Sequence, residues 1–441
     1  MKISKIGFKT VKLAGIDQMY PAQDILLKTG QLVQFGSGIY AYDTIPYYLQ
    51  LKIEEIIREE FNYVNCAEVL LPILQQQKLW EQSGRWKRFI DDGLMFTTVT
   101  DNGTYCLAPT AEEAVLKFAE NRLTSYKNLP ATLYQIGLKF RNEIRTRGYL
   151  FRGRAFQMFD AYSFGRTEED LKAEYDKIRY VYFKVFSRLG LYVVPVAADS
   201  GAMGGNICEE MMCLTPLGED TILYDKKTGL GLNAEVMERP DAKDYLKKFY
   251  NITDVSGFKK EKAMEMGHIF QLGTKYSDSM GIGFINEKDE KVPYQMGCYG
   301  IGVSRSVGLI YENNILKDKA GEPVGFALPF DLSPFKLYII AKNDNAERAK
   351  EAEKFYNECL AKNIPVILDD SESNIGVKIK NCKVLGVPFM CILGDRQGKG
   401  SLEIESSRTG QKAEKTVKGI ISIIKKNINL DEESINKLLF K

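Results

Sequence analysis

The chain has 441 residues, of which 44% are hydrophobic and 27% charged, with a formal net charge of +2. These values are ordinary for a soluble globular protein of two domains, and the small net charge restricts any nucleic-acid contact to local basic patches. No apolar run approaches the roughly 20 residues that span a bilayer, so we expect no membrane partner. The N-terminus, MKISKIGFKTVKLAG, lacks the apolar core of a signal peptide, which predicts a cytoplasmic protein.

The side chains that commonly bind metals or form disulfides are few or scattered. The chain has eight cysteines without any CxxC pair, and a single histidine, His268. This pattern predicts neither a disulfide framework nor a zinc site, so we expect no zinc cofactor. One histidine also argues against a catalytic triad that depends on this residue type.

Two elements are predicted early in the chain. Apolar residues at helical spacing predict an amphipathic helix over residues 48–61. The segment NCAEVLLPIL that follows is predicted as a strand with Pro72 inside it. Because proline cannot donate to a sheet ladder, we expect this strand at a sheet edge or at an interface.

A short strand and a helix are predicted next. The strand covers residues 104–108, and the helix opens near Pro109 and runs to about Tyr126. Thr110 and Glu113 have the spacing of a capping box, in which two side chains bind the free backbone N–H groups at a helix start. Glu113 is therefore predicted to have a structural role.

The stretch from Tyr134 to Phe164 is predicted as two strands joined by a basic loop. Apolar and polar residues alternate in the first strand, so one face should be packed and the other polar. Five arginines fall within 14 residues around the loop: Arg141, Arg145, Arg147, Arg152 and Arg154. Guanidinium groups bind phosphate oxygens bidentately, so such a loop suits a polyphosphate ligand. A hairpin with merely solvated arginines would show the same alternation.

The second strand of this hairpin carries side chains suited to a small pocket. Its residues on one face are Phe156, Met158, Asp160 and Tyr162. They combine two apolar groups, a carboxylate and a phenol. If this face continues the polar face of the first strand, a half-apolar pocket lies beside the arginines.

The rest of the chain predicts a long helix and a separate C-terminal domain. Residues 168–189 have a helical pattern, and three prolines between 323 and 334 mark a linker. Beyond it, strands and helices alternate, which predicts a small α/β domain. We therefore expect one domain over 1–332 and a second over 333–441.

Motifs in the hairpin resemble those of a known family. F-R-x-E at Phe140–Glu143 and R-x-R-x-F at Arg152–Phe156 resemble motif 2 of the class II aminoacyl-tRNA synthetases. DAYSF at Asp160–Phe164 resembles the prolyl branch of these enzymes. The segment Met264–Gly281 is similar to the prolyl stretch before motif 3, and G-x-G-x-x-R at Gly300–Arg305 resembles motif 3 itself.

Further segments resemble the same family in the expected order. The helix and strand around Pro72 are similar to motif 1, the dimer contact of class II enzymes, although an edge strand of a monomer would have the same pattern. LWEQSGRW at Leu79–Trp86 is shared with the prolyl enzymes, and ADSGAMGG at 198–205 resembles their ADSGAIGG. Residues 225–264 number only 40 where many bacterial relatives carry an editing insertion, so we expect a short charged connection there.

The chain is thus identified as a member of the prolyl-tRNA synthetases, of the bacterial type without the editing insertion. The resemblance implies an α+β catalytic domain built on an antiparallel sheet, followed by an anticodon-binding α/β domain. It implies a homodimer that activates proline with ATP and Mg²⁺ and transfers it to the 3′ end of tRNA(Pro). No metal ligand from the protein is firmly expected, although Glu209, or the adjacent Glu210, is as well suited to hold ATP-bound magnesium as to face solvent.

The resemblance also implies roles for the residues of the nucleotide site. Arg141 should hold the α-phosphate and the proline carboxylate, and Arg305 the γ-phosphate. Glu143 should accept a hydrogen bond from the adenine amino group, and Phe156 should stack on the ring. Arg152 should add a phosphate contact.

A second group of residues should recognise proline. Thr110 and Glu112 are expected to take the imino group, because a secondary ammonium presents two N–H donors to a hydroxyl and a carboxylate. The expected lining of the ring pocket consists of Met158, Asp160, Tyr162, His268 and Phe270. Arg145, on the loop, should contact the tRNA acceptor end.

Five positions depart from what relatives usually carry. Ala111 and Cys208 replace histidines, and Ser371 replaces an arginine expected to contact tRNA. Ala155 and Phe159 stand where relatives have glutamate and lysine. Strand parity places these two opposite the substrate face, so we expect a repacked support layer and an unchanged pocket.

Three other functions are compatible with parts of this pattern. A synthetase paralogue could activate proline or a similar amino acid for an acceptor other than tRNA, but it would have little use for an anticodon-binding domain. A non-catalytic module would not need Arg141, Glu143 and Arg305. Threonyl enzymes, the nearest class II rivals, normally need a zinc site, for which this chain has too few histidines.

Overall fold

The structure is a computed structural model that describes all residues except 9–10, 199–206, 343, 396, 399, 429 and 441. The chain forms two compact units, one of residues 37–39 and 53–306, the other of residues 1–36, 40–52 and 307–441. The N-terminal segments thus pack with the C-terminal part of the chain. The glycine-rich run at 198–205 lies almost wholly outside the described residues.

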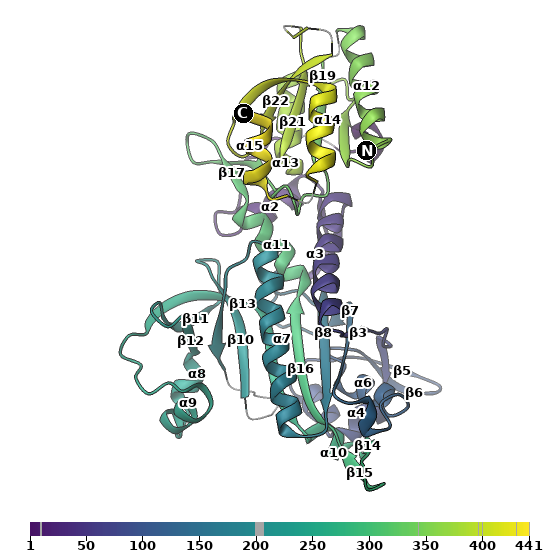
Figure 1. Cartoon of the computed structure of the whole chain (residues 1–441), viewed down its shortest axis with the longest axis vertical. Coiled ribbons are helices and arrows are strands. Elements are labelled where there is room, and N and C mark those ends of the chain that lie inside the picture. The colour runs from purple at the N-terminus through teal and green to yellow at the C-terminus, as the bar shows by residue number, and fades with distance from the viewer. Residues whose placement is uncertain are drawn as a thin grey trace. The chain divides into compact units, whose positions relative to one another are not determined.

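The unit of residues 37–39 and 53–306 is built on a nine-stranded sheet (Figure 1). Its pairs are antiparallel except β12 with β9 and β3 with β7, and β10 also pairs with β13. In pairing order, the strands are β10 (Ile207–Leu214), β9 (Val193–Ala197), β12 (Leu230–Asn233), β11 (Asp220–Asp225), β13 (Lys259–Gly273), β16 (Gln295–Gly302), β8 (Ala155–Gly165), β7 (Ala131–Phe140) and β3 (Ala67–Glu68). The predicted antiparallel sheet is confirmed.

A long helix covers the middle of this sheet. α7 (Glu168–Arg188) packs on β8, β13 and β16 and buries Ile178 and Val181. Thr167 starts it, because its side chain accepts a hydrogen bond from the backbone N–H of Asp170, at 3.2 Å. Three acidic residues in its first turn favour the same start through the helix dipole. The helix predicted over 168–189 is confirmed.

The predicted central hairpin is β7 and β8, which pair with Lys139 opposite Phe156 and Gln135 opposite Asp160. The two faces of β7, however, are not divided as the alternation predicted. Lys139 is only 2% exposed on the polar face, whereas Leu138 on the apolar face is 44% exposed. The polar side chains are buried because they meet Asp160 on the neighbouring strand.

The strand predicted over NCAEVLLPIL is wrong as one element. α3 (Thr44–Tyr63) confirms the helix before it, but only β3 and β4 (Leu74–Gln76) are strands, and Pro72 lies between them. β4 belongs to a different sheet, with β5 (Phe96–Thr100) and β6 (Gly103–Leu107). Pro72 has no N–H to donate, so the ladder stops before it. β3 does lie at a sheet edge, as expected.

The helix predicted from Pro109 is shorter than expected. α6 runs from Glu112 to Ala119, and its N-cap residue, Ala111, makes no side-chain cap. The capping box is therefore wrong. Thr110 donates to the Glu112 carboxylate instead, and Glu113 accepts from Ser83.

The segment 225–264 has structure of its own. It contains α8 (Ala234–Glu238) and α9 (Ala242–Tyr250) as well as β12, and these elements share a small apolar cluster. The connection is thus short, as expected, but not merely charged. The remaining elements of this unit are α4 (Gln77–Gln82), α5 (Trp86–Asp91), η1 (Tyr126–Asn128), α10 (Lys275–Ser279), β14 (Gly283–Ile285) and β15 (Lys291–Pro293).

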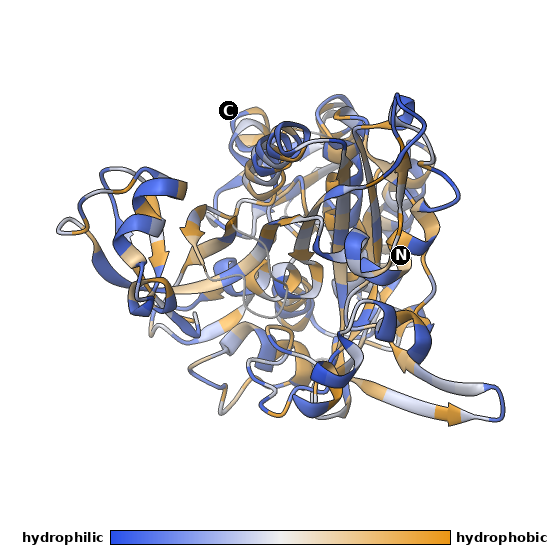
Figure 2. Cartoon of the chain, turned by 90° about the horizontal axis from the view of Figure 1, so that it is seen from below, coloured by the Kyte–Doolittle hydropathy of each residue, from blue (hydrophilic) through white to orange (hydrophobic). Residues whose placement is uncertain are grey.

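The other unit contains the predicted α/β domain. Its five-stranded sheet has the order β20-β19-β21-β22-β23, parallel in the first three strands and antiparallel in the rest. Figure 2 shows hydrophobic residues gathered in the strands of the chain and hydrophilic residues along outer helices and loops. The strands and helices are β19 (Leu337–Ala341), α12 (Ala346–Leu360), β20 (Val366–Asp369), α13 (Ile375–Leu385), β21 (Phe389–Leu393), β22 (Ser401–Ser406), β23 (Lys412–Thr416), α14 (Val417–Lys426) and α15 (Glu432–Phe440).

The N-terminal residues complete this sheet edge. Lys2 bridges Leu368 of β20 in parallel fashion, and Ser4 hydrogen-bonds Asp370 through its backbone N–H and its hydroxyl. The other elements of the unit are α1 (Ile3–Ile6), α2 (Pro21–Lys28), β1 (Leu32–Gly36), β2 (Ile39–Tyr42), β17 (Ile315–Lys317) and β18 (Pro323–Phe326), while α11 (Val303–Asn313), like α3, is shared by both units. Within the described residues, every helix is too short or too polar to cross a bilayer.

Candidate active site

A cavity of about 360 Å³ lies within the unit of residues 37–39 and 53–306, at the face of β7, β8, β13 and β16. It brings together most of the predicted site residues: Thr110, Glu112, Arg141, Glu143, Arg152, Phe156, Met158, Asp160, Tyr162, His268, Phe270 and Arg305. Arg145 and Glu209 are not among the lining residues. Arg145 is exposed on the loop between β7 and β8.

Two arginines from different elements meet at one end of the cavity. Arg141 follows β7, donates from Nε to the Pro109 carbonyl at 3.3 Å, and has its guanidinium 5.4 Å from the centre of the Phe156 ring. Arg305, on α11, donates from Nε to the Phe151 carbonyl at 2.9 Å. Burial lowers the pKa of Arg141, yet a guanidinium stays protonated in proteins. The two cations therefore favour an anionic ligand at this end.

Arg305 is also tied to an acidic residue that the sequence did not single out. Its Nη1 binds both the backbone carbonyl and the carboxylate of Glu265, the latter at 3.2 Å. Although burial acts in the opposite direction, His268 and Arg305 lower the pKa of Glu265. Glu265 is thus a fixed anion that orients the arginine.

The expected adenine residue, Glu143, has a partner within the chain. Arg152 donates from Nε to its carboxylate at 2.9 Å and from Nη1 to Glu219 at 3.4 Å. The Arg152 side chain is 44% exposed, so this pair is screened by water and easily rearranged. Glu143 and Arg152 therefore remain accessible to a ligand in the cavity.

A turn near the N-terminus holds the arginine-rich loop. The Gly38 carbonyl accepts from the backbone N–H of Arg154 at 2.7 Å, and the hydroxyls of Ser37 and Thr146 lie 2.6 Å apart. Gly38 has a φ of +72°, and a Cβ there would lie 2.6 Å from the Thr146 methyl group. Glycine is thus required by both backbone and space.

Glu112, another lining residue of the cavity, is completely buried. Its Oε2 accepts from the Thr110 hydroxyl at 2.6 Å and from Arg85 at 3.0 Å, and its Oε1 accepts from the Cys298 thiol at 3.2 Å. Burial alone would raise the pKa of Glu112, but Arg85 and these hydrogen bonds outweigh it and lower the pKa. Glu112 is therefore an ionised carboxylate in a dry site.

Asp160 is occupied by groups of the protein. It accepts from Gln135 at 2.9 Å, from Lys139 at 2.6 Å and from the Tyr162 hydroxyl at 2.9 Å. The Tyr162 oxygen in turn accepts from the backbone N–H of Ala111 at 3.1 Å. Ala111 thus contributes its backbone, so loss of the usual histidine leaves this link intact.

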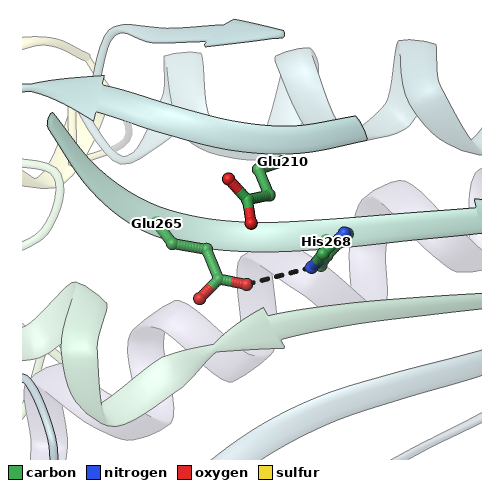
Figure 3. Close-up of side chains that lie close together, drawn as sticks. All are labelled: Glu210, Glu265 and His268. Carbon is green, nitrogen blue, oxygen red and sulfur yellow. Dashed lines mark hydrogen bonds and ion pairs between the residues drawn. The ribbon is translucent and has the colours of Figure 1, made fainter. Parts of the chain in front are cut away.

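Of the two residues suggested for magnesium, Glu210 and not Glu209 belongs to a described cluster that could hold a cation. Glu209 pairs with Arg179 at 2.7 Å and with the Tyr175 hydroxyl at 2.9 Å, on the other side of β10 from Glu210. One ligand atom from each of Glu210, Glu265 and His268 lies within 4.8 Å of the others (Figure 3). The strands β10 and β13 place them side by side.

Two oxygen donors in this cluster fit a hard divalent cation such as magnesium. Burial and the neighbouring Glu265 raise the pKa of Glu210 to about 7, so a bound cation would relieve an unfavourable charge. The His268 ring stacks on Phe270 with centroids 3.9 Å apart, and its Nδ1 lies 3.2 Å from Glu265. The imidazole thus orients the carboxylate and covers the phenyl ring.

Phe159 lies on the face of β8 opposite the cavity, as strand parity predicts. It is fully buried and packs on Phe61 and Tyr134, with ring centroids 4.3 and 5.4 Å away. The site residues missed from sequence are Gln135, Lys139, Arg85, Glu265 and Cys298. Arg85, within LWEQSGRW, and Glu265, within Met264–Gly281, had a signal, because both segments resemble the prolyl enzymes.

Comparisons with known proteins agree with this architecture. Residues 96–314 match the tRNA synthetase class II core domain (G, H, P, S and T), and residues 336–427 match the anticodon binding domain. A proline–tRNA ligase of Pelagibacter ubique is 36% identical over 426 residues, which cover 92% of this chain and 94% of the relative. The chain belongs to the proline–tRNA ligase family. A family member from Sulfurimonas denitrificans is 34% identical and aligns over 95% of this chain and its own full length.

Solved structures of this family share the fold. A prolyl-tRNA synthetase of Cryptosporidium parvum, complexed with halofuginone and AMPPNP, matches with a TM-score of 0.74 at 17% identity, over 98% of this chain and 81% of its own. A Giardia lamblia prolyl-tRNA synthetase in complex with prolyl-adenylate matches with a TM-score of 0.73 at 17% identity, over 96% and 80%. The class II core and the anticodon-binding domain predicted from the motifs are thus confirmed.

Proposed function

We propose that this chain is a proline–tRNA ligase that activates proline with ATP and transfers it to the 3′ end of tRNA(Pro). The observation that carries the proposal is one cavity lined both by the cations Arg141 and Arg305 and by the Thr110–Glu112 pair. This arrangement matches a substrate pair of polyphosphate and amino acid.

In the first step, a proline carboxylate oxygen bonds to the α-phosphorus of ATP while the bond to pyrophosphate breaks. No protein base is needed, so the chain contributes positioning and charge. Arg141 would hold the α-phosphate and the carboxylate, and Arg305 the far end of the triphosphate. Phe156 would stack on adenine, while Glu143 and Arg152 would release each other to bind the amino group and a phosphate.

The imino group of proline would bind at the buried end of the cavity. Its two N–H donors suit the Thr110 hydroxyl and the Glu112 carboxylate. Met158, Tyr162, His268 and Phe270 would surround the ring, with Asp160 acting behind them through Tyr162. We place magnesium, which would neutralise phosphate charge, at Glu210 and Glu265 and no longer at Glu209.

In the second step, the terminal hydroxyl of tRNA attacks the carbonyl carbon of prolyl-adenylate and AMP leaves. The exposed Arg145 would contact the acceptor end, and the anticodon-binding domain would select the tRNA. Because tRNA is charged in the cytoplasm, we propose that compartment for the enzyme. We also propose a homodimer through the segment around Pro72.

The test is pyrophosphate exchange into ATP measured with each of the twenty amino acids, followed by aminoacylation of tRNA(Pro). We expect exchange with proline and formation of prolyl-tRNA. Arg141→Lys should lower proline-dependent exchange by about 100-fold, because lysine cannot form the bidentate contact. Arg88→Lys, an exposed position, should not. Exchange without aminoacylation would instead indicate a paralogue with another acceptor, and exchange with a different amino acid would refute the proposal.

A further inference from the structure

Arg85 lies behind the imino end of the cavity, just before α5. Its side chain is only 4% exposed and does not line the cavity. Nη1 is 3.0 Å from Glu112 Oε2, 3.4 Å from Glu113 Oε1 and 3.0 Å from the Tyr276 hydroxyl. One nitrogen therefore contacts two carboxylates that follow each other at the start of α6.

An aromatic cage fixes this guanidinium. Its carbon lies 4.8 Å from the ring centre of Trp80, 4.7 Å from that of Phe89 and 5.2 Å from that of Tyr276. Nε and Nη2 make no hydrogen bond to the described residues, so the rings alone face them. Trp80 is itself held by Gln75, which accepts from its indole N–H at 2.8 Å. The guanidinium is attracted to the faces of these rings and is shielded from water, so a water-exposed cation elsewhere on the chain would not substitute for it.

We propose that Arg85 is a positioning residue for proline recognition, which keeps the Glu112 carboxylate charged and aimed at the imino group by neutralising the Glu112–Glu113 pair. The proposal rests on the proposed role of Glu112 in binding that group. Arg85 itself touches no substrate, because it lies outside the cavity.

The reason is the cost of two buried carboxylates side by side. Glu113 accepts from the Ser83 hydroxyl at 2.5 Å and has little else to stabilise its charge beyond Arg85. Burial raises the pKa of Glu113, whereas the pKa of Glu112 is lowered despite burial. The single cation thus assigns the negative charge to Glu112, the carboxylate that reaches the cavity.

Other titratable groups face Glu112 without replacing this cation. Arg141 donates to the Pro109 carbonyl, and Lys275, on α10, has its pKa lowered by burial and by nearby arginines. In the part of the chain that the structure describes, the titratable groups that act on Glu112 include Arg85, Glu113, Arg141, Tyr162, Lys275, Tyr276 and Cys298. Arg85 donates to the carboxylate as a cation, at 3.0 Å.

The test is Arg85→Met in the full-length chain, assayed by proline-dependent pyrophosphate exchange. Without the cation, Glu112 and Glu113 should share a proton, so the KM for proline should rise by about 10- to 100-fold while the KM for ATP stays within about twofold. In this variant kcat/KM for proline should increase as the pH is raised and Glu112 ionises, a pH dependence absent from the unaltered chain. Arg88→Met, at an exposed position within α5, is the matched control.

Adding Glu113→Gln to Arg85→Met removes the competing carboxylate. We expect the KM for proline to fall at least about threefold from that of the single variant and the pH dependence to weaken. Arg85→Lys keeps the charge and serves if Arg85→Met does not fold; it should raise the KM for proline without the pH dependence. The inference would be overturned if Arg85→Met left the KM for proline unchanged. It would also be overturned if this variant raised the KM values for proline and ATP equally and kcat/KM for proline gained no pH dependence. If the unaltered chain does not use proline, the proposed function itself fails first.

Discussion

Asp160 lines the cavity, yet both of its oxygens already accept hydrogen bonds from the protein. Lys139 and Asp160 are each about 2% exposed, so their ion pair is withdrawn from water. Such a pair is costly to break, because the remaining charge stays buried. The carboxylate therefore holds Lys139 and Tyr162 in place and acts on the ligand through them.

Asp160→Asn should destabilise the chain by about 3–5 kcal/mol, since it leaves the Lys139 ammonium without a counterion. The free energy of unfolding in urea measures this change. Asp91→Asn is the matched control, because Asp91 pairs with Lys87 at 2.5 Å on the exposed surface. We expect that substitution to cost less than about 1 kcal/mol. Equal losses of unfolding free energy in the two variants would show that the buried ion pair stabilises the chain no more than the exposed one.

At this scale the sequence predicts which side chains gather but not how they bind each other. The period of two placed Phe156, Met158, Asp160 and Tyr162 on one face, and the cavity contains all four. The bond from Lys139 depends on the register of β7 against β8, which alternation does not fix. Arg85 reaches Glu112 across 27 positions of the chain, and only the folded sheet brings them together.

The turn at Gly38 packs closely on the arginine-rich loop. Gly38→Ala would place a Cβ 2.6 Å from the Thr146 methyl group and 2.8 Å from the backbone nitrogen of Arg154. The loop must then shift, and we expect the KM for ATP to rise by about tenfold in pyrophosphate exchange. Gly30→Ala is the control, because Gly30 has a similar φ of +74° but no atom within 4 Å of the added Cβ. The same rise in both variants would mean that backbone strain alone is responsible.

A buried carboxylate starts the helix α2. Glu312 accepts from the backbone N–H groups of Ala22 and Gln23 at 3.2 and 3.3 Å, and burial raises its pKa to about 7 from 4.5. Because the folded pKa is the higher one, the contribution of Glu312 to stability is fully present below pH 4.5. It is lost as the pH rises through about 7.

Glu312→Gln should therefore weaken the pH dependence of unfolding between pH 4.5 and pH 7. The difference in unfolding free energy between the variant and the unaltered chain should change by about 2–3 kcal/mol over that range, in favour of the variant at the higher pH. Urea titrations at several pH values measure it. Glu322→Gln, at an exposed position, should show no such trend. If the difference in unfolding free energy for Glu312→Gln did not change with pH, the expected titration of the Glu312 carboxyl would be refuted.

Elements were predicted well where periodicity was long and poorly where a single residue decided them. α7 and the hairpin β7–β8 follow from runs of ten residues or more. The predicted strand through Pro72 was wrong because one missing N–H ends the ladder. The predicted capping box was wrong because Glu113 binds Ser83 and Arg85, which are distant in the sequence. A local sequence pattern carries no information about partners that are distant in the chain.

At the scale of the whole molecule, the N-terminal residues join the C-terminal sheet. Ile3 is buried, and Ser4 bonds Asp370 across 366 positions. No pattern in the first 30 residues predicted this, because a short strand at a sheet edge needs only a few backbone groups and one apolar side chain. The predicted domain boundary at residue 332 therefore stays a prediction about function. In the structure, residues 1–36 belong to the same compact unit as residues 307–441.

The proposed dimer concerns the exposed apolar side chains beside β3. Tyr63, at the end of α3, is 86% exposed and Leu70, after β3, is 89% exposed. Ile73 and Leu74, which follow Pro72, are also exposed, at 40% and 50%. Exposed apolar residues at the edge of the main sheet favour a second copy of the chain as the partner that covers them.

Leu70→Asp should convert the dimer to a monomer, because it places a charge in the apolar contact. Sedimentation velocity measures the mass, and circular dichroism checks that the fold is kept. Leu360→Asp is the matched control, since Leu360 is 45% exposed at the end of α12 in the anticodon-binding domain and should leave the mass unchanged. One copy of the chain supplies every residue that lines the cavity described above. Pyrophosphate exchange should therefore persist in the monomer, at a reduced rate. An unaltered chain that sediments as a monomer would refute the proposed dimer.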